Sequence, residues 1–399
     1  MNRTHTADPR RNPFLLVLAS GLRAALFPIP VITLFWKDEI GLSLADIMWL
    51  QSIFGATAVL LEFPSGYLAD RLGYRYSLLA GAGFGVAGWM VYAMGNTFAG
   101  MAAAEVLLGI GLAFTSGADS ALLFASLKTT DGIARYRSWE GRVRAAAQTS
   151  EAMSSAVGGW LYSIAPRLPF WLQVPLAMAG FGVVAGMREV PPAAAGERIQ
   201  HVARAWHIVR HALAHHRRLR SAMALSVALG LTTYVVVWLI QPWMQLRGIP
   251  APWFGPLWAA AHLWLAVVSL TSSRVSQAAG VKPALLGCCV LGAVSYWGLC
   301  LISSPWAVVF YLGFMTVRGL QGPILAALLQ DDAPSEDRAS VLSLNTLLFR
   351  LAAAVILPPI GALADHWGIE PVLGLMGTLS LMAALAAWLA FTRAHTQPG

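Results

Sequence analysis

Charged residues are scarce in this sequence of 399 residues. Asp, Glu, Lys and Arg make up 12% of it, whereas hydrophobic residues make up 57% and the mean hydropathy is +0.62. A soluble domain carries about 25% charged residues, so this chain has too few charges to solvate the surface of a globular protein of its size. The composition therefore excludes an ordinary soluble protein and indicates a chain embedded in a lipid bilayer.

Cysteine is also scarce, and no pattern of metal ligands or nucleophiles stands out. The three cysteines, Cys288, Cys289 and Cys300, lie in one apolar run, which gives neither a disulfide framework nor a metal site. The histidines within residues 207–215 have only Glu197 as a nearby acidic partner, so a solvated basic face explains them better than a metal site. The sequence lacks a phosphate-binding Gly-Lys loop. We therefore expect no metal, no cofactor and no ATP-driven pumping.

Long apolar runs recur along the whole chain. Each has about 20 residues, the length of a helix that crosses a hydrocarbon core of about 30 Å. A spanning segment must satisfy its own backbone hydrogen bonds, and runs that are continuous rather than alternating exclude a β-barrel. We predict an all-α membrane protein with twelve transmembrane helices, at residues 13–36, 44–66, 77–96, 98–126, 142–165, 168–187, 220–243, 252–273, 283–303, 305–329, 339–364 and 371–391.

The lysines and arginines are distributed unevenly among the loops. If the N-terminus is cytoplasmic, only Lys37, Arg167 and Arg247 of the 27 basic residues fall in outside loops, three lie within spans and the others lie inside. This bias matches the positive-inside rule. The formal net charge of +8 therefore predicts topology rather than nucleic-acid binding. We expect both termini to be cytoplasmic and the protein to be integral to the bacterial inner membrane.

The longest connection divides the chain into two halves of six spans. We predict an N-terminal bundle at residues 1–187, a cytoplasmic linker at 188–219 with an amphipathic helix, and a C-terminal bundle at 220–399. A shift of 207 residues superposes residues 65–79 on 272–286, with a serine, a glycine, a basic residue and a Leu-Leu pair retained. Two six-helix halves in parallel orientation are a layout found in secondary transporters.

The loop between the second and third spans carries the most specific motif. Residues 66–75 read GYLADRLGYR, which resembles the loop 2–3 signature of the major facilitator superfamily (MFS), G-x-L-A-D-R-x-G-R-[KR]. The segment Ser-Gly-Ala-Asp at 116–119 also looks like a stretch of poorly characterised bacterial members. The resemblance implies the MFS fold with two pseudo-symmetric bundles, alternating-access transport and a monomer. It assigns a conformational-switch role to Gly66, Asp70, Arg71, Gly73 and Arg75.

Two features depart from the patterns of that superfamily. Many members carry an arginine in the fourth span, where this chain has Glu105. The fifth span ends in Gly158 and Gly159 without the Gly-Pro of the antiporter signature. Assignment to the drug:proton antiporters does not follow from these residues.

Ionisable residues within spans are costly, about 2.5–3.5 kcal/mol each on insertion scales, and each is a functional candidate. Acids predominate in the first half and arginines in the second. We expect Glu151, together with Glu105, to carry a coupling proton, because a buried carboxyl can be tuned for proton transfer. The substrate-binding candidates are Arg23, Arg318, Arg350, Phe27, Tyr234, Trp238, Trp258 and His262.

Several of these charges also have structural interpretations. Arg23 would form a static ion pair with Glu151 or Glu105 rather than bind substrate. Glu62 and Asp119 are expected to be structural or gating acids that cap the motif loop or pair with its arginines at 71, 142 or 144. Each aromatic candidate is more often a packing residue than a ligand contact.

The sequence therefore predicts a secondary transporter that moves a small amphipathic molecule, with an anionic cargo favoured by the arginines. Proton-coupled export by an antiporter is the first interpretation, and a proton-coupled importer or a uniporter of a metabolite is the alternative. A polytopic membrane enzyme would need a catalytic cluster, and a sensor without transport would need a signalling domain; the sequence offers neither. The expected partners are substrate, protons and lipid.

Overall fold

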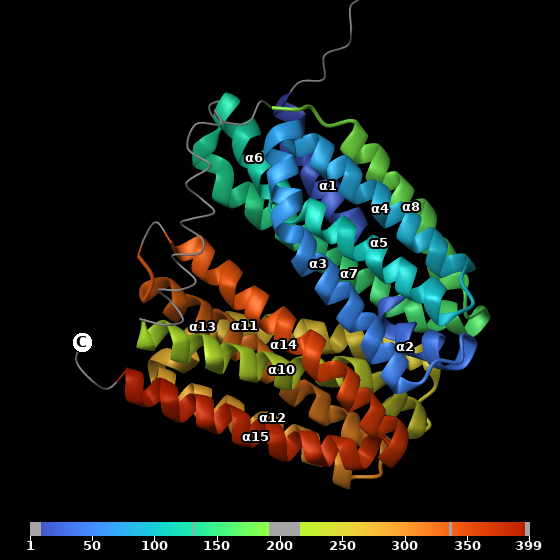
Figure 1. The fold of residues 1–399 in the computed structure, drawn as a ribbon, viewed down its shortest axis with the longest axis vertical. Coiled ribbons are helices and arrows are strands. Elements are labelled where there is room, and N and C mark those ends of the chain that lie inside the picture. The colour runs from blue at the N-terminus through green and yellow to red at the C-terminus, as the bar shows by residue number, and fades with distance from the viewer. Residues whose placement is uncertain (1–8, 131, 191–215, 335–336, 396–399) are drawn as a thin grey trace, which may run out of the picture. The chain divides into compact units, whose positions relative to one another are not determined.

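The computed structural model describes residues 9–130, 132–190, 216–334 and 337–395, and these residues form helices and short connections without a β-strand (Figure 1). The α-helices are α1 (Asn12–Ala24), α2 (Ile32–Leu34), α3 (Leu44–Leu72), α4 (Tyr74–Met94), α5 (Phe98–Thr115), α6 (Ala118–Thr129), α7 (Tyr136–Ile164), α8 (Leu168–Ala185), α10 (Arg217–Leu246), α11 (Phe254–Ala279), α12 (Val281–Leu301), α13 (Val309–Asp331), α14 (Arg338–Trp367) and α15 (Ile369–Ala394). The all-α prediction is confirmed.

Within the described residues, eleven helical segments are long and apolar enough to cross a membrane. They correspond to the predicted spans with the exception of the fifth. That position is occupied by α7, which has 29 residues and the length to span a bilayer but is not among the eleven. Its first half carries arginines at 137, 142 and 144 and a glutamate at 140, which dilute its apolar character.

Two of the predicted spans are interrupted within their length, although each remains a candidate membrane span. In the first, α1 ends at Ala24, and a 3-10 turn (Ile29–Val31), α2 and a π-helical turn (Phe35–Glu39) follow. In the fourth, α5 and α6 are separated at Gly117, whose φ of +79° lies in the left-handed region that residues with a Cβ avoid. The apolar runs at 13–36 and 98–126 conceal these breaks because hydropathy does not report backbone dihedrals.

The chain divides into two compact units. The first comprises Met1–Leu42, Trp49–Ala195 and Ala251–Ala259, and the second comprises Ser43–Met48, Gly196–Pro250 and Ala260–Gly399. In the first unit α4 packs against α5 and α8, and α1 packs against α7 and α8. In the second, α10 packs against α13, α14 and α15, and α12 packs against α13 and α15.

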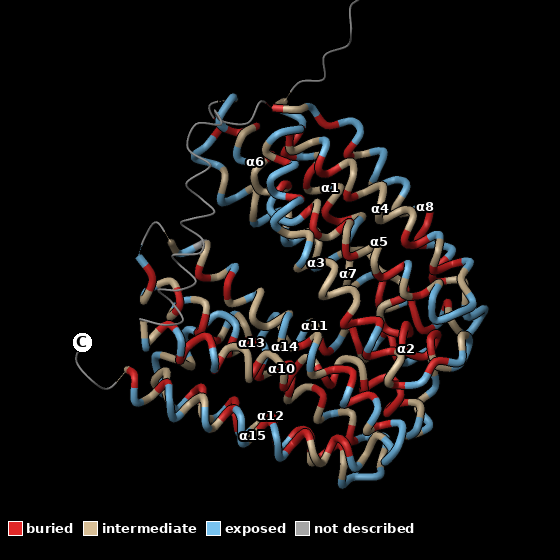
Figure 2. Tube along the Cα trace, viewed as in Figure 1, coloured by how far each residue is buried: buried red, intermediate tan, exposed pale blue. Residues whose placement is uncertain are grey.

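Buried residues, red in Figure 2, occur along the helices of both units, and many of them are apolar. In the first unit they include Leu16, Leu78, Leu122, Leu127 and Val184. In the second they include Leu229, Leu285, Val317, Leu329 and Phe391. Most of the predicted linker at 188–219, with its amphipathic helix, lies outside the described residues.

The backbone supports the internal repeat where the 207-residue shift superposes two glycines. Gly73 is the N-cap of α4 with φ 110° and ψ 152°, and Gly280 is the N-cap of α12 with φ 85° and ψ 153°. A positive φ of this kind is accessible to glycine and strained for other residues. The two weakly similar segments therefore share an unusual local conformation as well as a few identities.

Candidate functional site

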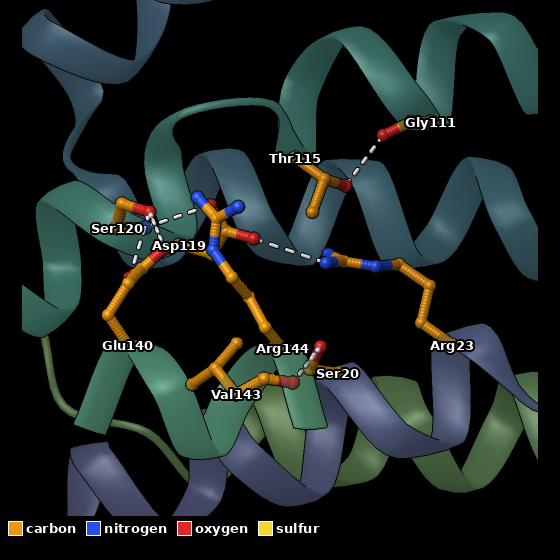
Figure 3. Close-up of polar contacts among 9 residues, drawn as sticks. All are labelled: Ser20, Arg23, Gly111, Thr115, Asp119, Ser120, Glu140, Val143 and Arg144. Carbon is orange, nitrogen blue, oxygen red and sulfur yellow. Dashed lines mark hydrogen bonds and ion pairs between the residues drawn. The ribbon is translucent and has the colours of Figure 1, made fainter. Parts of the chain in front are cut away.

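An ion pair joins the two interrupted spans of the first unit. The Nη2 atom of Arg23 lies 3.1 Å from Oδ2 of Asp119, and the two side chains are 49% and 23% exposed (Figure 3). Arg23 occupies the last turn of α1 and Asp119 the first turn of α6. A cation at a helix C-terminus and an anion at a helix N-terminus are both favoured by the helix dipoles.

Side chains of neighbouring helices support the break after α1. The backbone N–H of Phe27 has no helical acceptor and donates to Oε1 of Gln173, which is 1% exposed. A Cβ on Gly158 of α7 would lie 2.3 Å from the carbonyl oxygen of Phe27, so only glycine permits this approach. A backbone N–H released by the interruption is therefore satisfied by a buried side chain, as a lipid environment requires.

A second polar group lies beside the ion pair, between α6 and α7. The Ser120 hydroxyl donates to the carboxylate of Glu140, and Nε of Arg144 lies 3.3 Å from Oε1 of Glu140 (Figure 3). Burial, followed by the nearby Glu140 carboxylate, raises the pKa of the Tyr136 hydroxyl at the start of α7. Tyr136 therefore stays protonated and neutral beside this group.

These partners correct two expectations from the sequence. Arg23 pairs with Asp119, not with Glu151 or Glu105. Asp119, in turn, does not pair with an arginine at 71, 142 or 144, because Arg144 pairs with Glu140 and the other two lie over aromatic rings. Arg23 and Asp119 are 96 positions apart, so no sequence spacing could have assigned their pairing.

Glu105 lies in a buried polar cluster of α3, α4 and α5. Its side chain is 4% exposed, and its Oε1 accepts hydrogen bonds from the Tyr92 hydroxyl and, at 3.2 Å, from Nε2 of Gln51. The ring of Trp36 packs against Tyr92 at a centroid distance of 6.2 Å. Among the described residues no cation forms an ion pair with Glu105, although a buried charge must be paired or neutralised.

The other acids of the first unit are less buried. Glu151 is half-buried on α7, where its backbone carbonyl accepts from the Ser154 hydroxyl. Glu62 is half-buried on α3, and its backbone carbonyl accepts from the Ser65 hydroxyl. Both residues have a further interaction within the protein. The structure does not join Glu151 to Glu105 by a hydrogen bond among the residues it describes.

In the second unit Arg318 is exposed in the middle of α13. It has no ion pair, hydrogen bond or cation–π contact with the residues that the structure describes. Arg350, on α14, is half-buried and has a partner within the protein. An arginine at mid-depth is too costly to face hydrocarbon and therefore belongs beside water or a polar ligand.

Three of the aromatic candidates are partly accessible, and one is a packing residue. Tyr234 contacts Trp238 edge-on at 6.1 Å and Phe349 at 5.3 Å, within the second unit. Phe27 is half-buried at the break after α1, whereas Trp258 is only 6% exposed. His262 is half-buried on α11. Tyr234 and Trp238 therefore form a partly accessible aromatic pair within the second unit.

The motif of residues 66–75 is held by the end of α8 and the segment that follows it. The carboxylate of Glu189 accepts the backbone N–H groups of Tyr74 and Arg75 at 3.0 and 2.9 Å, and a Cβ on Gly73 would collide with it. The Arg75 guanidinium donates to the carbonyl oxygen of Ala185. These hydrogen bonds connect the start of α4 to the end of α8. Asp70 has a separate interaction within the protein.

Comparison with known families identifies the architecture. The family model of the Major Facilitator Superfamily matches residues 14–358. The chain belongs to the major facilitator superfamily. MFS membership accounts for the twelve-span pattern, the loop 2–3 motif and the repeated halves, and it indicates a transporter rather than an enzyme.

Solved structures of similar fold are also transporters. The nucleoside transporter NupG shares 13% identity at a TM-score of 0.81, over 97% of this chain and all of that one. A POT family transporter in complex with 5-aminolevulinic acid shares 14% identity at a TM-score of 0.75, over 98% and 97% of the two chains. At such identities the likeness shows the fold alone. No curated protein matches the sequence.

The sequence predictions omitted several of these polar partners. Gln51, Tyr92 and Gln173 resemble ordinary polar residues within spans, and no local signal marks them. Glu140 belongs to the charged first half of α7, and the sequence does not distinguish it there as an ion-pair partner. Glu189 directly follows the sixth span, where a glutamate among arginines would have been a usable signal.

Proposed function

We propose that this MFS protein is a proton-coupled antiporter that exports a small amphipathic molecule bearing an anionic group. The observation that carries the anionic cargo is Arg318, an exposed arginine at the middle of α13 without a protein counter-ion among the described residues. An arginine keeps its charge at any working pH and can bind a carboxylate or phosphate through two parallel hydrogen bonds. Tyr234 and Trp238 would contact the apolar part of the cargo.

Glu105 supports the proton-coupling part of the proposal. It is a buried carboxyl held by two neutral donors, Tyr92 and Gln51. A site that exchanges a proton during transport needs a carboxyl whose charge is not already compensated by a fixed cation. We assign the coupling proton to Glu105, with Glu151, on α7 of the same unit, as the second candidate.

The paired interruptions support a binding region in the first unit. Broken helices with free ends are a recurrent feature of transporter binding sites. Here the ends are occupied by Arg23 and Asp119, whose half-exposed pair is accessible to a competing charge. In our proposal an anionic cargo takes the place of Asp119 beside Arg23.

The outward direction is proposed from the amphipathic character of the proposed cargo. An amphipathic molecule enters cells by partitioning into the bilayer, so the work that remains for a transporter is to move it outward. Inward movement of protons supplies the free energy in that arrangement. The proposal places the protein as a monomer in a bacterial inner membrane with both termini in the cytoplasm.

The first experiment compares small molecules inside and outside cells that express the parent protein, Glu105→Gln or Glu151→Gln. A compound that accumulates outside only with the parent protein names the cargo and supports export. Depletion from the medium instead overturns export and supports an importer. Nucleosides, peptides and 5-aminolevulinic acid, which occur in the names of proteins of similar fold, are suitable first test compounds.

The coupling assignment is tested with purified protein in liposomes. Glu105→Gln should abolish uphill transport driven by a proton gradient and spare exchange of labelled for unlabelled cargo, because exchange needs no net proton movement. If Glu105→Gln retains uphill transport while Glu151→Gln loses it, Glu151 is the coupling residue. Uphill transport by both variants would contradict the proton-coupling proposal.

A further inference from the structure

A second copy of the switch motif lies at the end of α14. Residues 361–368 read GALADHWG, and residues 66–73 read GYLADRLG, so five of the eight positions are identical. The likeness extends to the backbone, because Gly368 has φ 87° and ψ 164° as the residue before α15, much as Gly73 has before α4. The first copy ends the second span, and this copy ends the eleventh.

The second copy contacts the N-terminus of α3, whose first residues, Ser43–Met48, belong to the second unit. The Asp365 carboxylate accepts the backbone N–H of Leu44 through Oδ1 and that of Ala45 through Oδ2, both at 2.8 Å. One helical turn earlier, a Cβ on Gly361 would lie 2.5 Å from the carbonyl oxygen of Leu44. The glycine therefore permits the approach and the aspartate binds the helix end.

The start of α3 has its own cap besides Asp365. The Ser43 hydroxyl accepts the backbone N–H of Asp46, and the Asp46 carboxylate accepts the backbone N–H of Ser43. This capping box leaves the N–H groups of Leu44 and Ala45 for an external acceptor. The helix end consequently remains capped when Asp365 leaves, which is the property that a reversible contact needs.

The contact of Asp365 lies at one end of α3, a helix whose residues belong to both units. The helix continues without interruption to Leu72, and its residues from Trp49 onward belong to the first unit. Any movement of one unit against the other during a transport cycle therefore acts on the turn that Asp365 holds. Charge-assisted bonds to backbone N–H groups are strong enough to bias such an equilibrium.

We propose that residues 361–368 are a second switch motif, and that the Asp365 carboxylate is a latch that caps α3 in the conformation described here and releases it during the cycle. The proposal rests on alternating-access transport. This latch would lie at the predicted outer face, whereas the motif of residues 66–75 lies at the predicted inner face. The two motifs would therefore have opposing effects during the transport cycle. Gly361 is the positioning residue of this latch.

The test measures distances between spin labels on the full-length protein in lipid nanodiscs. In a background without Cys288, Cys289 and Cys300, labels are placed at Ala99 and Ser303, exposed positions at the predicted outer face that belong to different units. Loss of one charge-assisted hydrogen bond in Asp365→Asn should lower the ratio of the parent's dominant distance population to the alternative population about tenfold. Gly361→Ala should shift it in the same direction.

Asp46→Asn is the matched control, because it removes a carboxylate from the same helix end without touching the Asp365 contact. It should retain the parent distance distribution. A parent-like distribution in both Asp365→Asn and Gly361→Ala would overturn the latch, and so would an equal shift in Asp46→Asn. The measurement needs neither cargo nor a proton gradient, so its result stands even if the transport assays fail. Likewise, the results of the transport assays stand even if the latch is overturned.

Discussion

Polar side chains within the spans divide into those that the protein satisfies and those that it leaves exposed. Glu105 is fully enclosed and accepts hydrogen bonds from Tyr92 and Gln51, whereas Arg318 is exposed without a counter-ion among the described residues. Burying a charge is costly unless it is paired, so each arrangement demands an explanation beyond packing. At the scale of single residues, these two positions carry the functional proposal.

Replacing Arg318 with Gln should weaken the interaction with an anionic cargo. The loss of a charge-assisted hydrogen bond corresponds to an increase in KM of about tenfold or more, with a smaller effect for Arg318→Lys, which keeps the charge. Initial rates of cargo uptake into inverted vesicles measure it. Arg274→Gln, at an exposed arginine near the end of α11, controls for the loss of one positive charge. Equal KM values for Arg318→Gln and the parent would remove Arg318 from the binding site.

Replacing Tyr92 with Phe should alter the pH dependence of transport without abolishing it. The variant removes one donor to the Glu105 carboxylate and keeps the ring that packs against Trp36 and Phe170. A hydrogen bond to the charged form favours that form, so its loss should move the pH profile of the rate toward higher pH. Rates between pH 5 and pH 9 test this. A superimposable profile would indicate that Glu105 does not exchange the coupling proton.

At the scale of elements, the interrupted helices matter more than the continuous ones. The breaks after α1 and between α5 and α6 place an arginine and an aspartate at facing helix ends. Within one continuous helix the same residues would lack these dipoles and free backbone groups. The proposal for the first unit therefore depends on backbone conformation as much as on side-chain chemistry.

Gly117→Ala should destabilise the protein because Gly117 adopts φ +79°. A left-handed residue with a Cβ costs about 1–2 kcal/mol, so the melting temperature should fall and transport should weaken. Gly85→Ala is the matched control, since its added Cβ would meet nothing within 4 Å and its backbone is helical. Thermal melting of both variants in detergent measures the difference. A parent-like melting temperature for Gly117→Ala would show that the break tolerates a side chain.

Asp119→Asn should tighten the binding of an anionic cargo, because it removes the competitor for Arg23. The expected result is a lower KM for Asp119→Asn and a higher KM for Arg23→Gln. Glu140→Gln serves as the control, since Glu140 lies in the neighbouring group and pairs with Arg144 instead. A purely structural pair would lower the melting temperature in both Arg23 and Asp119 variants and leave KM unchanged.

At the scale of the whole molecule, the distribution of basic residues predicts which loops face each side of the membrane. Single cysteines at Lys128 and Ser303, both exposed, should react with a membrane-impermeant maleimide on opposite sides. In intact spheroplasts only the cysteine at Ser303 should be labelled, and disruption of the membrane should expose the cysteine at Lys128. Labelling of Lys128→Cys in sealed spheroplasts would reverse the proposed topology.

The sequence by itself determined the membrane class, the position of nearly every span and the superfamily. Hydropathy and the ten-residue motif are local properties, so they survive without knowledge of the packing. Span boundaries followed from them, but the breaks at residues 25–28 and 116–117 did not, because hydropathy does not report backbone dihedrals. The contacts of Gln173 and Gly158 with Phe27 at the first break come from helices distant in the sequence.

Tertiary structure alone decided which polar groups meet. Arg23 lies 96 positions from Asp119, and Asp365 lies more than 300 positions from the N–H groups that it caps. Each of these bonds depends on helices that are brought together by burial of apolar surface, which does not encode a particular polar partner in the local pattern. The sequence therefore supplied the charges, and packing decided whether each became an ion pair, a cap or an exposed binding group.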